Sequence, residues 1–277
     1  MDFVKLHGLG NDYVYVDCRA QPVANPGEVA RAVSDRRRGV GSDGLILVCP
    51  SARADVRMEM YNADGSRAQM CGNGIRCLAK LVYEREIVPR RLMRVETDAG
   101  VLGVEVFDTQ GRVDRVRVDM GRPSLNPRRL PCTLEADRIV GWPLELGGRS
   151  WQVTCISVGN PHAVTFVDDL ADLDLAAIGP QFENAPMFPE RINAHFARAE
   201  ADDRVAIRTW ERGSGATQAC GTGACAVCVA GVLAGRTGRR IQACLPGGVL
   251  DIVWSVEDDH LHMTGPAVEV FTGRWPD

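Results

Sequence analysis

The sequence predicts an α+β protein with two pseudo-symmetric domains, each a β-barrel-like sheet wrapped around a central helix. The first observation is a repeated phrase, because AQMCGNGIRC (residues 68–77) returns as TQACGTGACAVC (residues 217–228). The second is that most apolar segments alternate with polar residues or are rich in β-branched residues, as strands are. The third is that each half has one long helical segment, which starts at its Cys-Gly-x-Gly motif.

The repeat has a fixed offset, since Cys71 and Cys220 lie 149 residues apart. The same offset places the turn at Gly10-Asn11 onto the turn at Gly159-Asn160. It also places Asn62, which opens NADGSRAQMCG, onto Glu211, which opens ERGSGATQACG. Self-similarity at a fixed period is typical of duplicated units. We therefore interpret the chain as two copies of one unit.

The expected elements follow the repeat in chain order. In the first half we expect strands at residues 13–17, 45–48, 56–61, 93–97, 101–107 and 113–120, with a helix at 72–87. In the second half we expect strands at residues 151–158, 162–167, 204–210, 249–254 and 267–271, with a helix at 221–235. The second helix lacks a polar face, which predicts burial on all sides. Gly, Pro and Asn cluster at Met120–Arg129, so we expect domains at residues 1–119 and 120–265.

Composition excludes several classes of function. A net charge of −4 gives no electrostatic reason to expect nucleic acid or an anionic membrane as a partner. No apolar run approaches the roughly 20 residues of a membrane span, and the N-terminus lacks the pattern of a signal segment. We therefore expect a cytoplasmic protein whose ten cysteines are reduced thiols.

Cys71 and Cys220 stand where a thiol can become reactive. The N-terminus of a helix carries partial positive charge and free N–H groups, which stabilise an anion. Cysteines in such places have a pKa lowered from about 8.5 toward roughly 3.5–7.5. Glycines let the backbone turn and let a ligand approach, while Asn73 and Thr222 can cap the helix or contact the ligand. Each motif is thus a candidate thiol beside an anion site.

Two such motifs predict two-base proton transfer. We expect the halves to place their thiols on opposite faces of one substrate carbon, where one removes a proton and the other returns one. That is the chemistry of a racemase or epimerase. Thiols so close are also expected to form a disulfide on oxidation, within the limits of Cα separation.

No cofactor or metal is expected. Pyridoxal phosphate needs a Schiff-base lysine, and neither of the two lysines, Lys5 and Lys80, has a suitable setting. The pair Cys225 and Cys228 has zinc-ligand spacing but lies in an apolar helix without a second pair. The histidines form no H-E-x-x-H motif, and no glycine-rich nucleotide motif follows a strand.

The motifs together resemble the diaminopimelate epimerase family. The resemblance extends from HGLGNDY through YNADGSRAQMCGNGIR, SVGNPHAV, ERGSGATQACGTGA and LPGGVL to MTGPA, nearly the whole chain. It implies interconversion of LL- and meso-diaminopimelate without a cofactor, in lysine and peptidoglycan precursor biosynthesis. It also implies two α/β domains, with residues 266–277 returning to the first, and suggests a homodimer.

The resemblance also implies a set of site residues. The catalytic cysteines match Cys71 and Cys220, and a histidine and a glutamate that assist them match His162 and Glu211. The residues that contact the reacting carboxylate match Gly72 and Asn73 on one helix and Gly221 and Thr222 on the other. The remaining substrate-binding residues match Asn11, Asn62, Asn160, Asn193 and Arg212.

One position departs from some relatives, which have Gln where this chain has Gly44. A contact to the substrate is then missing or made by water or Ser42, with an effect on affinity rather than on the reaction.

Two other functions stay open. A proline or hydroxyproline racemase shares the two-thiol logic, but its first motif resembles Met-Cys-Gly-His-Gly, whereas this chain has MCGNG. A thiol-based redox or metal-binding protein would not exchange the α-hydrogen of a substrate with solvent.

Overall fold

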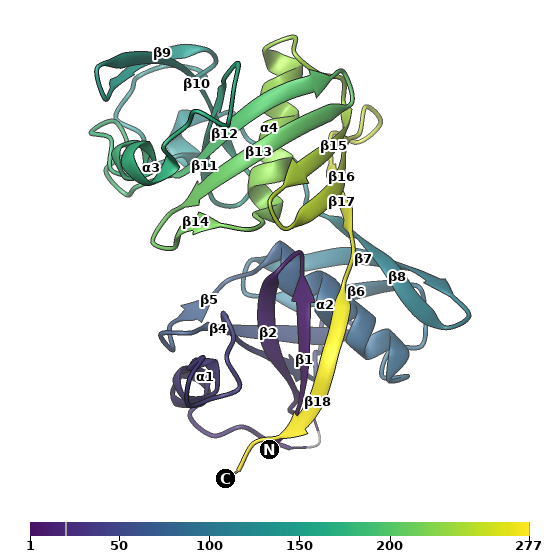
Figure 1. Ribbon diagram of the computed structural model, residues 1–277. Helices are drawn as coiled ribbons and strands as arrows, with labels where there is room; N and C mark the ends of the chain where they lie inside the picture. The colour runs from purple at the N-terminus through teal and green to yellow at the C-terminus, as the bar shows by residue number, and fades with distance from the viewer. Residues whose placement is uncertain (20, 277) are drawn as a thin grey trace. The chain divides into compact units, whose positions relative to one another are not determined.

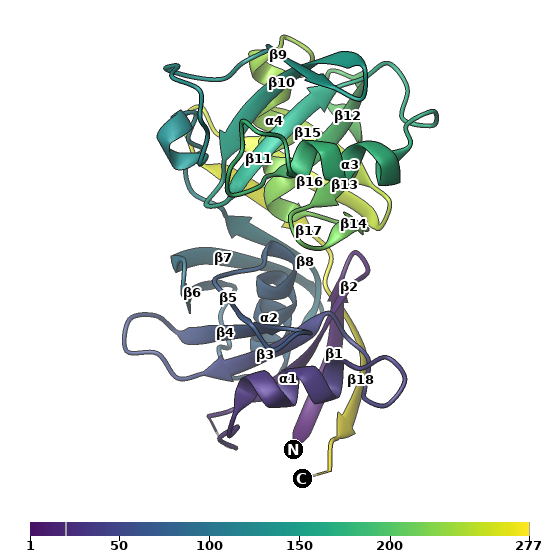
Figure 2. The ribbon, with the colours of Figure 1, turned by 90° about the vertical axis from the view of Figure 1, so that its left-hand side faces the viewer.

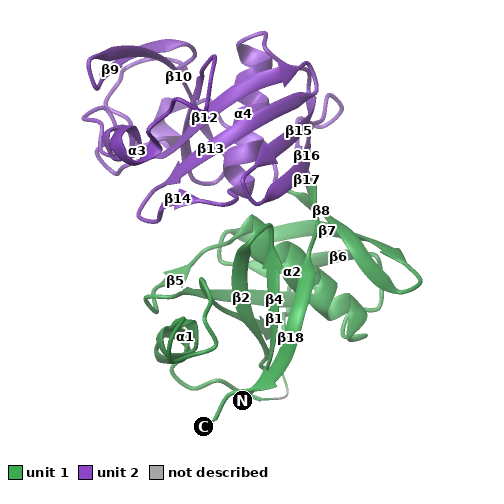
Figure 3. Cartoon of the chain, viewed as in Figure 1, with its two compact units in different colours: residues 1–119, 264–277 green, residues 120–263 purple. Residues whose placement is uncertain are grey.

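The computed structural model describes residues 1–19 and 21–276, and the chain divides into two compact units (Figures 1 and 3). Unit 1 consists of Met1–Asp119 and Thr264–Asp277, and unit 2 consists of Met120–Met263. Strands predominate in both units, which confirms the predicted α+β class.

Unit 1 is a curved sheet around one long helix. Its strands pair in the order β18-β1-β2-β3-β4-β6-β7-β8, with β5 also on β4; β2–β3 and β4–β6 run parallel and the other pairs antiparallel. The elements are β1 Asp2–Gly8, β2 Asn11–Asp17, α1 Pro26–Ser34, β3 Gly44–Cys49, β4 Val56–Asn62, β5 Arg67–Ala68, α2 Gly72–Glu84, β6 Leu92–Thr97, β7 Gly100–Thr109, β8 Arg112–Asp119 and β18 Val268–Arg274.

Unit 2 repeats this plan. Its strands pair in the order β9-β10-β11-β12-β13-β15-β16, with β14 on β13, and the parallel pairs are β11–β12 and β13–β15. The elements are the 3-10 helix η1 Pro127–Arg129, β9 Trp142–Leu146, β10 Arg149–Ser157, β11 Pro161–Phe166, α3 Leu175–Glu183, β12 Asn193–Ala201, β13 Arg204–Glu211, β14 Gly215–Thr217, α4 Gly221–Leu233, β15 Arg240–Leu245 and β16 Gly248–Trp254. The strand β17, Leu261–Gly265, begins in unit 2 and ends in the first residues of the returning segment of unit 1.

The repeat extends to the register of the strands. Tyr13 lies opposite Gly44 in the β2–β3 pair, and His162 lies opposite Asn193 in the β11–β12 pair. The C-terminal strand β18 pairs with β1 in unit 1, as β9 pairs with β10 in unit 2 (Figure 1). The predicted strand at 267–271 therefore completes unit 1 at the place that β9 takes in unit 2.

The two predicted helices are confirmed and lie at the centre of their units (Figures 1 and 2). Within unit 1, α2 packs against β1, β2, β7 and β8, and within unit 2, α4 packs against β10, β11, β12, β15 and β16. Residues Ala224–Ala230 of α4 are fully buried, as its apolar sequence predicted. Both helices end earlier than expected, where Glu86 and Gly235 adopt positive φ of 55° and 63°.

The helices α1 and α3 were not expected. They occupy matching places, Pro26–Ser34 and Leu175–Glu183, and each has nine residues. Isolated helices this short are marginal, so tertiary packing decides whether they form. Two of their contacts illustrate this: Val33 packs into a cluster with Phe3 and Leu45, while Phe182 meets Trp151 edge-on at 5.4 Å. Seven strands were also not predicted, namely β1, β5, β9, β12, β14, β15 and β17.

Candidate active site

Cys71 is the N-cap of α2, in extended conformation at φ −134° and ψ 123°. Its sulfur accepts a hydrogen bond from the backbone N–H of Gly74 at 3.4 Å, and its thiol donates to Oδ1 of Asn11 at 3.4 Å. Gly72 and Asn73 form the first turn of the helix. The sequence prediction of a thiol at a helix N-terminus is therefore confirmed for this half.

Asn11 is held in one orientation by a neighbouring carboxylate. Its Nδ2 donates to Oδ2 of Asp43 at 2.7 Å, which turns Oδ1 toward Cys71 and toward Nδ2 of Asn73, 3.3 Å away. Asp43 is itself fixed by the backbone N–H of Asp12 and by the guanidinium of Arg36. Sequence reasoning missed Asp43, because this residue stands just before β3, a separate segment from the turn that carries Asn11.

Two more unpredicted residues surround Cys71. Arg76 has no exposed surface, and its Nη2 donates to Oδ1 of Asn73 at 3.0 Å, which orients that amide. Tyr13 takes the place in unit 1 that His162 has in unit 2. Burial is the main cause that raises the pKa of Tyr13 well above 10, and the electrostatic interaction with Cys71 adds to it. This phenol therefore stays protonated beside the thiol.

Cys220 is the N-cap of α4 in a matching extended conformation, at φ −120° and ψ 108°. Gly221 and Thr222 begin this helix, and Oγ1 of Thr222 lies 3.6 Å from the sulfur. Burial raises the pKa of Cys220 well above 9, and the charge of Glu211 adds to that effect. The expectation of a lowered pKa is wrong for this thiol, because desolvation outweighs the helix terminus.

Glu211 lies at the end of β13 and accepts a hydrogen bond of 2.5 Å from Oγ1 of Thr217 on β14. Arg212 follows in the turn, and its guanidinium donates to the carbonyl of Glu190 at 3.2 Å. The buried carboxylate of Glu183, on α3, accepts from the backbone N–H of Gly213 at 2.9 Å. The unexpected helix α3 thus holds the turn that carries Glu211 and Arg212.

Asn193 uses both ends of its amide within unit 2. Oδ1 accepts from the backbone N–H of Arg212 at 3.0 Å, and Nδ2 donates to the carbonyl of Pro161 at 2.8 Å. In this structure Asn193 therefore positions the backbone of Arg212. The repeat relates Asn193 to Gly44, which pairs with Asn62 in unit 1. Nδ2 of Asn62 donates a hydrogen bond to Oγ of Ser66 at 3.0 Å in an exposed turn.

Asn160 and His162 are joined in a chain of side chains. Nε2 of His162 lies 2.8 Å from Oδ1 of Asn160, and Nδ1 lies 2.8 Å from Nε2 of His195. Nδ1 of His195 lies 3.0 Å from Oγ1 of Thr209. Burial lowers the pKa of both histidines, His162 well below 6.5 and His195 to about 3. Thr209 had no sequence signal beyond its position in a predicted strand, and His195 had none, because β12 was not predicted.

Gly44, where some relatives have Gln, lies in a confined position. A Cβ atom there would overlap the backbone carbonyl of Tyr61 and press on the ring of Tyr13. A side chain at residue 44 would therefore require the backbone to shift, and the Tyr13 ring occupies the adjoining space.

Sequence comparison identifies the family. A sequence model described as diaminopimelate epimerase matches residues 3–126 and 154–270. The chain is a member of the diaminopimelate epimerase family. It is 49% identical over 274 residues to the diaminopimelate epimerase of Acetivibrio thermocellus, covering 99% of this chain and 98% of that protein. It is 50% identical over 276 residues to that of Desulforudis audaxviator, covering 99% of both.

Solved structures show the fold of this diaminopimelate epimerase family member. A probable proline racemase from Agrobacterium radiobacter has a TM-score of 0.71 at 14% identity, covering 99% of this chain and 92% of that one. A PhzF-family phenazine biosynthesis protein from Bacillus anthracis has a TM-score of 0.70 at 16% identity, covering 99% and 98%. At these identities the likeness concerns the fold alone.

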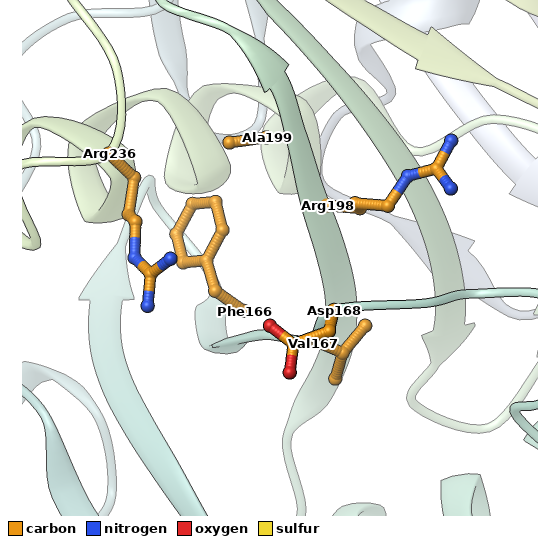
Figure 4. A pocket seen from close by; sticks show the side chains of 6 residues that line it. All are labelled: Phe166, Val167, Asp168, Arg198, Ala199 and Arg236. Atoms are coloured by element: carbon orange, nitrogen blue, oxygen red, sulfur yellow. The ribbon is translucent and has the colours of Figure 1, made fainter.

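Within residues 1–19 and 21–276, no group of three or more His, Cys, Asp or Glu side chains is arranged to hold a metal ion. Among the helices of that same part of the chain, none has the length and apolar character that a membrane crossing requires. A pocket of about 180 Å³ in unit 2, between Phe166, Arg198 and Arg236, contains none of the candidate site residues (Figure 4).

Proposed function

We propose that the protein is a cofactor-independent epimerase that interconverts LL- and meso-2,6-diaminopimelate by proton transfer between two cysteines. The observation that carries the proposal is that Cys71 and Cys220 cap equivalent 13-residue helices in a member of this family. Lysine and peptidoglycan precursor biosynthesis is the corresponding role.

In the proposed reaction one cysteine, as thiolate, takes the α-hydrogen of the substrate as a proton. The electron pair of the C–H bond moves into the carboxylate, which the N–H groups at Gly72-Asn73 and Gly221-Thr222 bind. The other cysteine, as thiol, gives its proton to the opposite face of the carbon, so that the two sulfurs exchange protonation states. The raised pKa of Cys220 favours this cysteine as the thiol of the resting enzyme.

The other candidate residues have supporting parts in this proposal. Asn11, Asn62, Asn160, Asn193 and Arg212 bind or position the polar groups of diaminopimelate, and Glu211 and His162 assist the thiols. A proline-type racemase shares the fold. The sequence match to diaminopimelate epimerases at 45–50% identity favours diaminopimelate over proline as the substrate. We further propose a cytoplasmic homodimer, for which light scattering of the purified protein is the test.

The function is tested by incubating the reduced protein with LL-diaminopimelate in D₂O. We expect the meso isomer, with deuterium at the inverted carbon, and no product with Cys71→Ala or Cys220→Ala. Reduced wild-type protein that neither inverts nor exchanges this substrate would refute the proposal, and proline and hydroxyproline would be tried next.

A further inference from the structure

His195, whose ring contacts His162, has no part in the proposed reaction. His195, on β12, has no exposed surface, and its ring joins His162 on one side to Thr209 on the other. The first turn of α4, which Cys220 caps, packs directly on it: a Cβ atom at Gly223 would overlap the His195 ring. His195 therefore lies between the strands and the helix that carry the candidate site of unit 2.

The hydrogen bonds that link Thr209, His195, His162 and Asn160 all have the same direction. Oδ1 of Asn160 can only accept, so Nε2 of His162 carries a proton and donates to it. A neutral imidazole has one N–H, so Nδ1 of His162 accepts from Nε2–H of His195. Nδ1 of His195 then accepts from the hydroxyl of Thr209. The lowered pKa of both histidines agrees with two neutral rings.

We propose that His195 is a positioning residue for the reaction: it holds His162 as the neutral Nε2–H tautomer, and His162 in turn holds the Asn160 amide. The amide oxygen of Asn160 is turned to His162, so its NH₂ group is directed away as a donor. In the resting enzyme His162 is a hydrogen-bond donor and not a base. The inference rests on the proposed function only where it concerns catalysis.

The tautomers are tested without substrate. In protein labelled with ¹⁵N-histidine, long-range ¹H–¹⁵N correlations distinguish the two ring nitrogens, and His162→Gln and His195→Gln assign the signals. We expect both rings as Nε2–H tautomers, unchanged between pH 8 and pH 5. A proton on Nδ1 of His162, or protonation of its ring near pH 6.5, would overturn the proposal.

The catalytic part is tested with two substitutions. His195→Gln keeps an N–H near the Nε2 position, whereas His195→Leu is apolar and of similar size. We expect His195→Leu to raise KM about tenfold with a smaller change in kcat, and His195→Gln to stay within about threefold of wild type. Wild-type KM in a folded His195→Leu enzyme would contradict the proposal.

Two controls separate the possible failures. If His195→Leu does not fold, Thr209→Val removes only the hydroxyl that donates to Nδ1 of His195. We expect this variant to raise KM about threefold. An unchanged KM would then count against the proposal. If wild-type protein does not convert diaminopimelate, the proposed function fails, and the tautomer measurement still decides the state of His162.

A second and independent observation concerns Cys18 and Cys49. The parallel register of β2 and β3 pairs Asp17 with Val48, so the next residues, Cys18 and Cys49, stand opposite each other. Their sulfur atoms are 2.7 Å apart, and both side chains are partly exposed. Neighbouring strands lie about 4.8 Å apart, within the usual range of Cα separations across a disulfide.

This pair is remote from Cys71 along the strands. Asn11, which contacts Cys71, begins β2, and Cys18 follows its last residue. Seven residues of extended chain span about 23 Å. Chemistry at Cys18 and Cys49 is therefore separate from chemistry at the candidate site of unit 1.

We infer that Cys18 and Cys49 are a redox modification site that forms an intramolecular disulfide with a peroxide as oxidant. The first sulfur attacks a peroxide oxygen, which gives a sulfenic acid and releases water when the oxidant is hydrogen peroxide. The second thiol attacks that sulfur and forms the S–S bond, and a second water leaves. Burial and the neighbouring Cys18 raise the pKa of Cys49.

The disulfide is tested in a Cys71→Ser/Cys220→Ser background, which removes the candidate catalytic thiols. After treatment with hydrogen peroxide, non-reducing peptide mapping is expected to find Cys18 joined to Cys49 and Tm raised by about 5 °C, reversed by dithiothreitol. Cys18→Ser is expected to abolish both effects and Cys244→Ser neither. Oxidation of other cysteines without this crosslink would overturn the inference.

Discussion

The carboxylate of Glu211 and the buried thiol of Cys220 are electrostatic neighbours, and burial and this charge together raise the pKa of the thiol well above 9. Cys220 is therefore protonated at neutral pH although it caps a helix. Cys71 has a different partner, the amide oxygen of Asn11. The two repeated motifs thus place their sulfurs in chemically different surroundings.

Removal of the charge at Glu211 should make Cys220 more acidic. In Glu211→Gln we expect iodoacetamide to alkylate Cys220 about tenfold faster at pH 9, a shift of about one pH unit. The rate is measured by mass spectrometry of the Cys220 peptide between pH 7 and pH 10. Cys244 in the same protein is the internal reference, and an equal acceleration there would point to general loosening instead.

Asp43 should matter for catalysis although it is not expected to touch the substrate. In Asp43→Ala, Nδ2 of Asn11 loses its acceptor and the amide is free to turn, so we expect kcat/KM to fall about tenfold. Asp98→Ala, which also removes a carboxylate paired with arginine in unit 1, is the matched control. An equal change in kcat/KM in Asp43→Ala and Asp98→Ala would show that the orientation of Asn11 does not matter for catalysis.

A side chain at residue 44 should destabilise unit 1. Gly44→Ala places a Cβ atom against the carbonyl of Tyr61, and backbone must shift to admit it, so we expect a loss of about 1–3 kcal/mol in unfolding free energy. The control is Gly103→Ala, where the nearest atom to the new Cβ would be Cβ of Asp119 at 3.8 Å. Urea denaturation compares the two, and equal stabilities would show that the site relaxes freely.

Alkaline pH should weaken the fold through its buried thiols. Burial raises the pKa of Cys77 to about 11, whereas an unfolded cysteine has a pKa of about 8.5. The native state then holds a proton that the unfolded state releases, so stability is intact below pH 8.5 and falls as pH rises toward 11. For this thiol the slope is about 1.4 kcal/mol per pH unit.

The alkaline effect is measured by urea denaturation of wild type and Cys77→Ala between pH 7 and pH 11. We expect the difference between the two unfolding free energies to shrink as pH rises above 8.5. Parallel curves over the whole range would show that Cys77 does not contribute.

Local sequence pattern was enough to predict the duplicated architecture and the two thiols. The Cys-Gly-x-Gly motif, its helix and its flanking turns are contiguous in the chain, and the strands have their own periodicity. The apolar composition of α4 likewise predicted its burial, because a helix without a polar face has no side to expose to water. The residues after Gly265 were placed with the first half by resemblance alone.

Only the tertiary structure decided what surrounds the thiols. Asp43, Glu183 and His195 reach the candidate site from other segments of the chain, and no spacing in the sequence relates them to it. Arg76 lies within α2 itself, and only the structure shows that it orients Asn73. The short helices α1 and α3 likewise form through packing rather than through propensity. The raised pKa of Cys220 has the same origin, since the sequence determined the helix terminus but burial and Glu211 determined the charge of the sulfur.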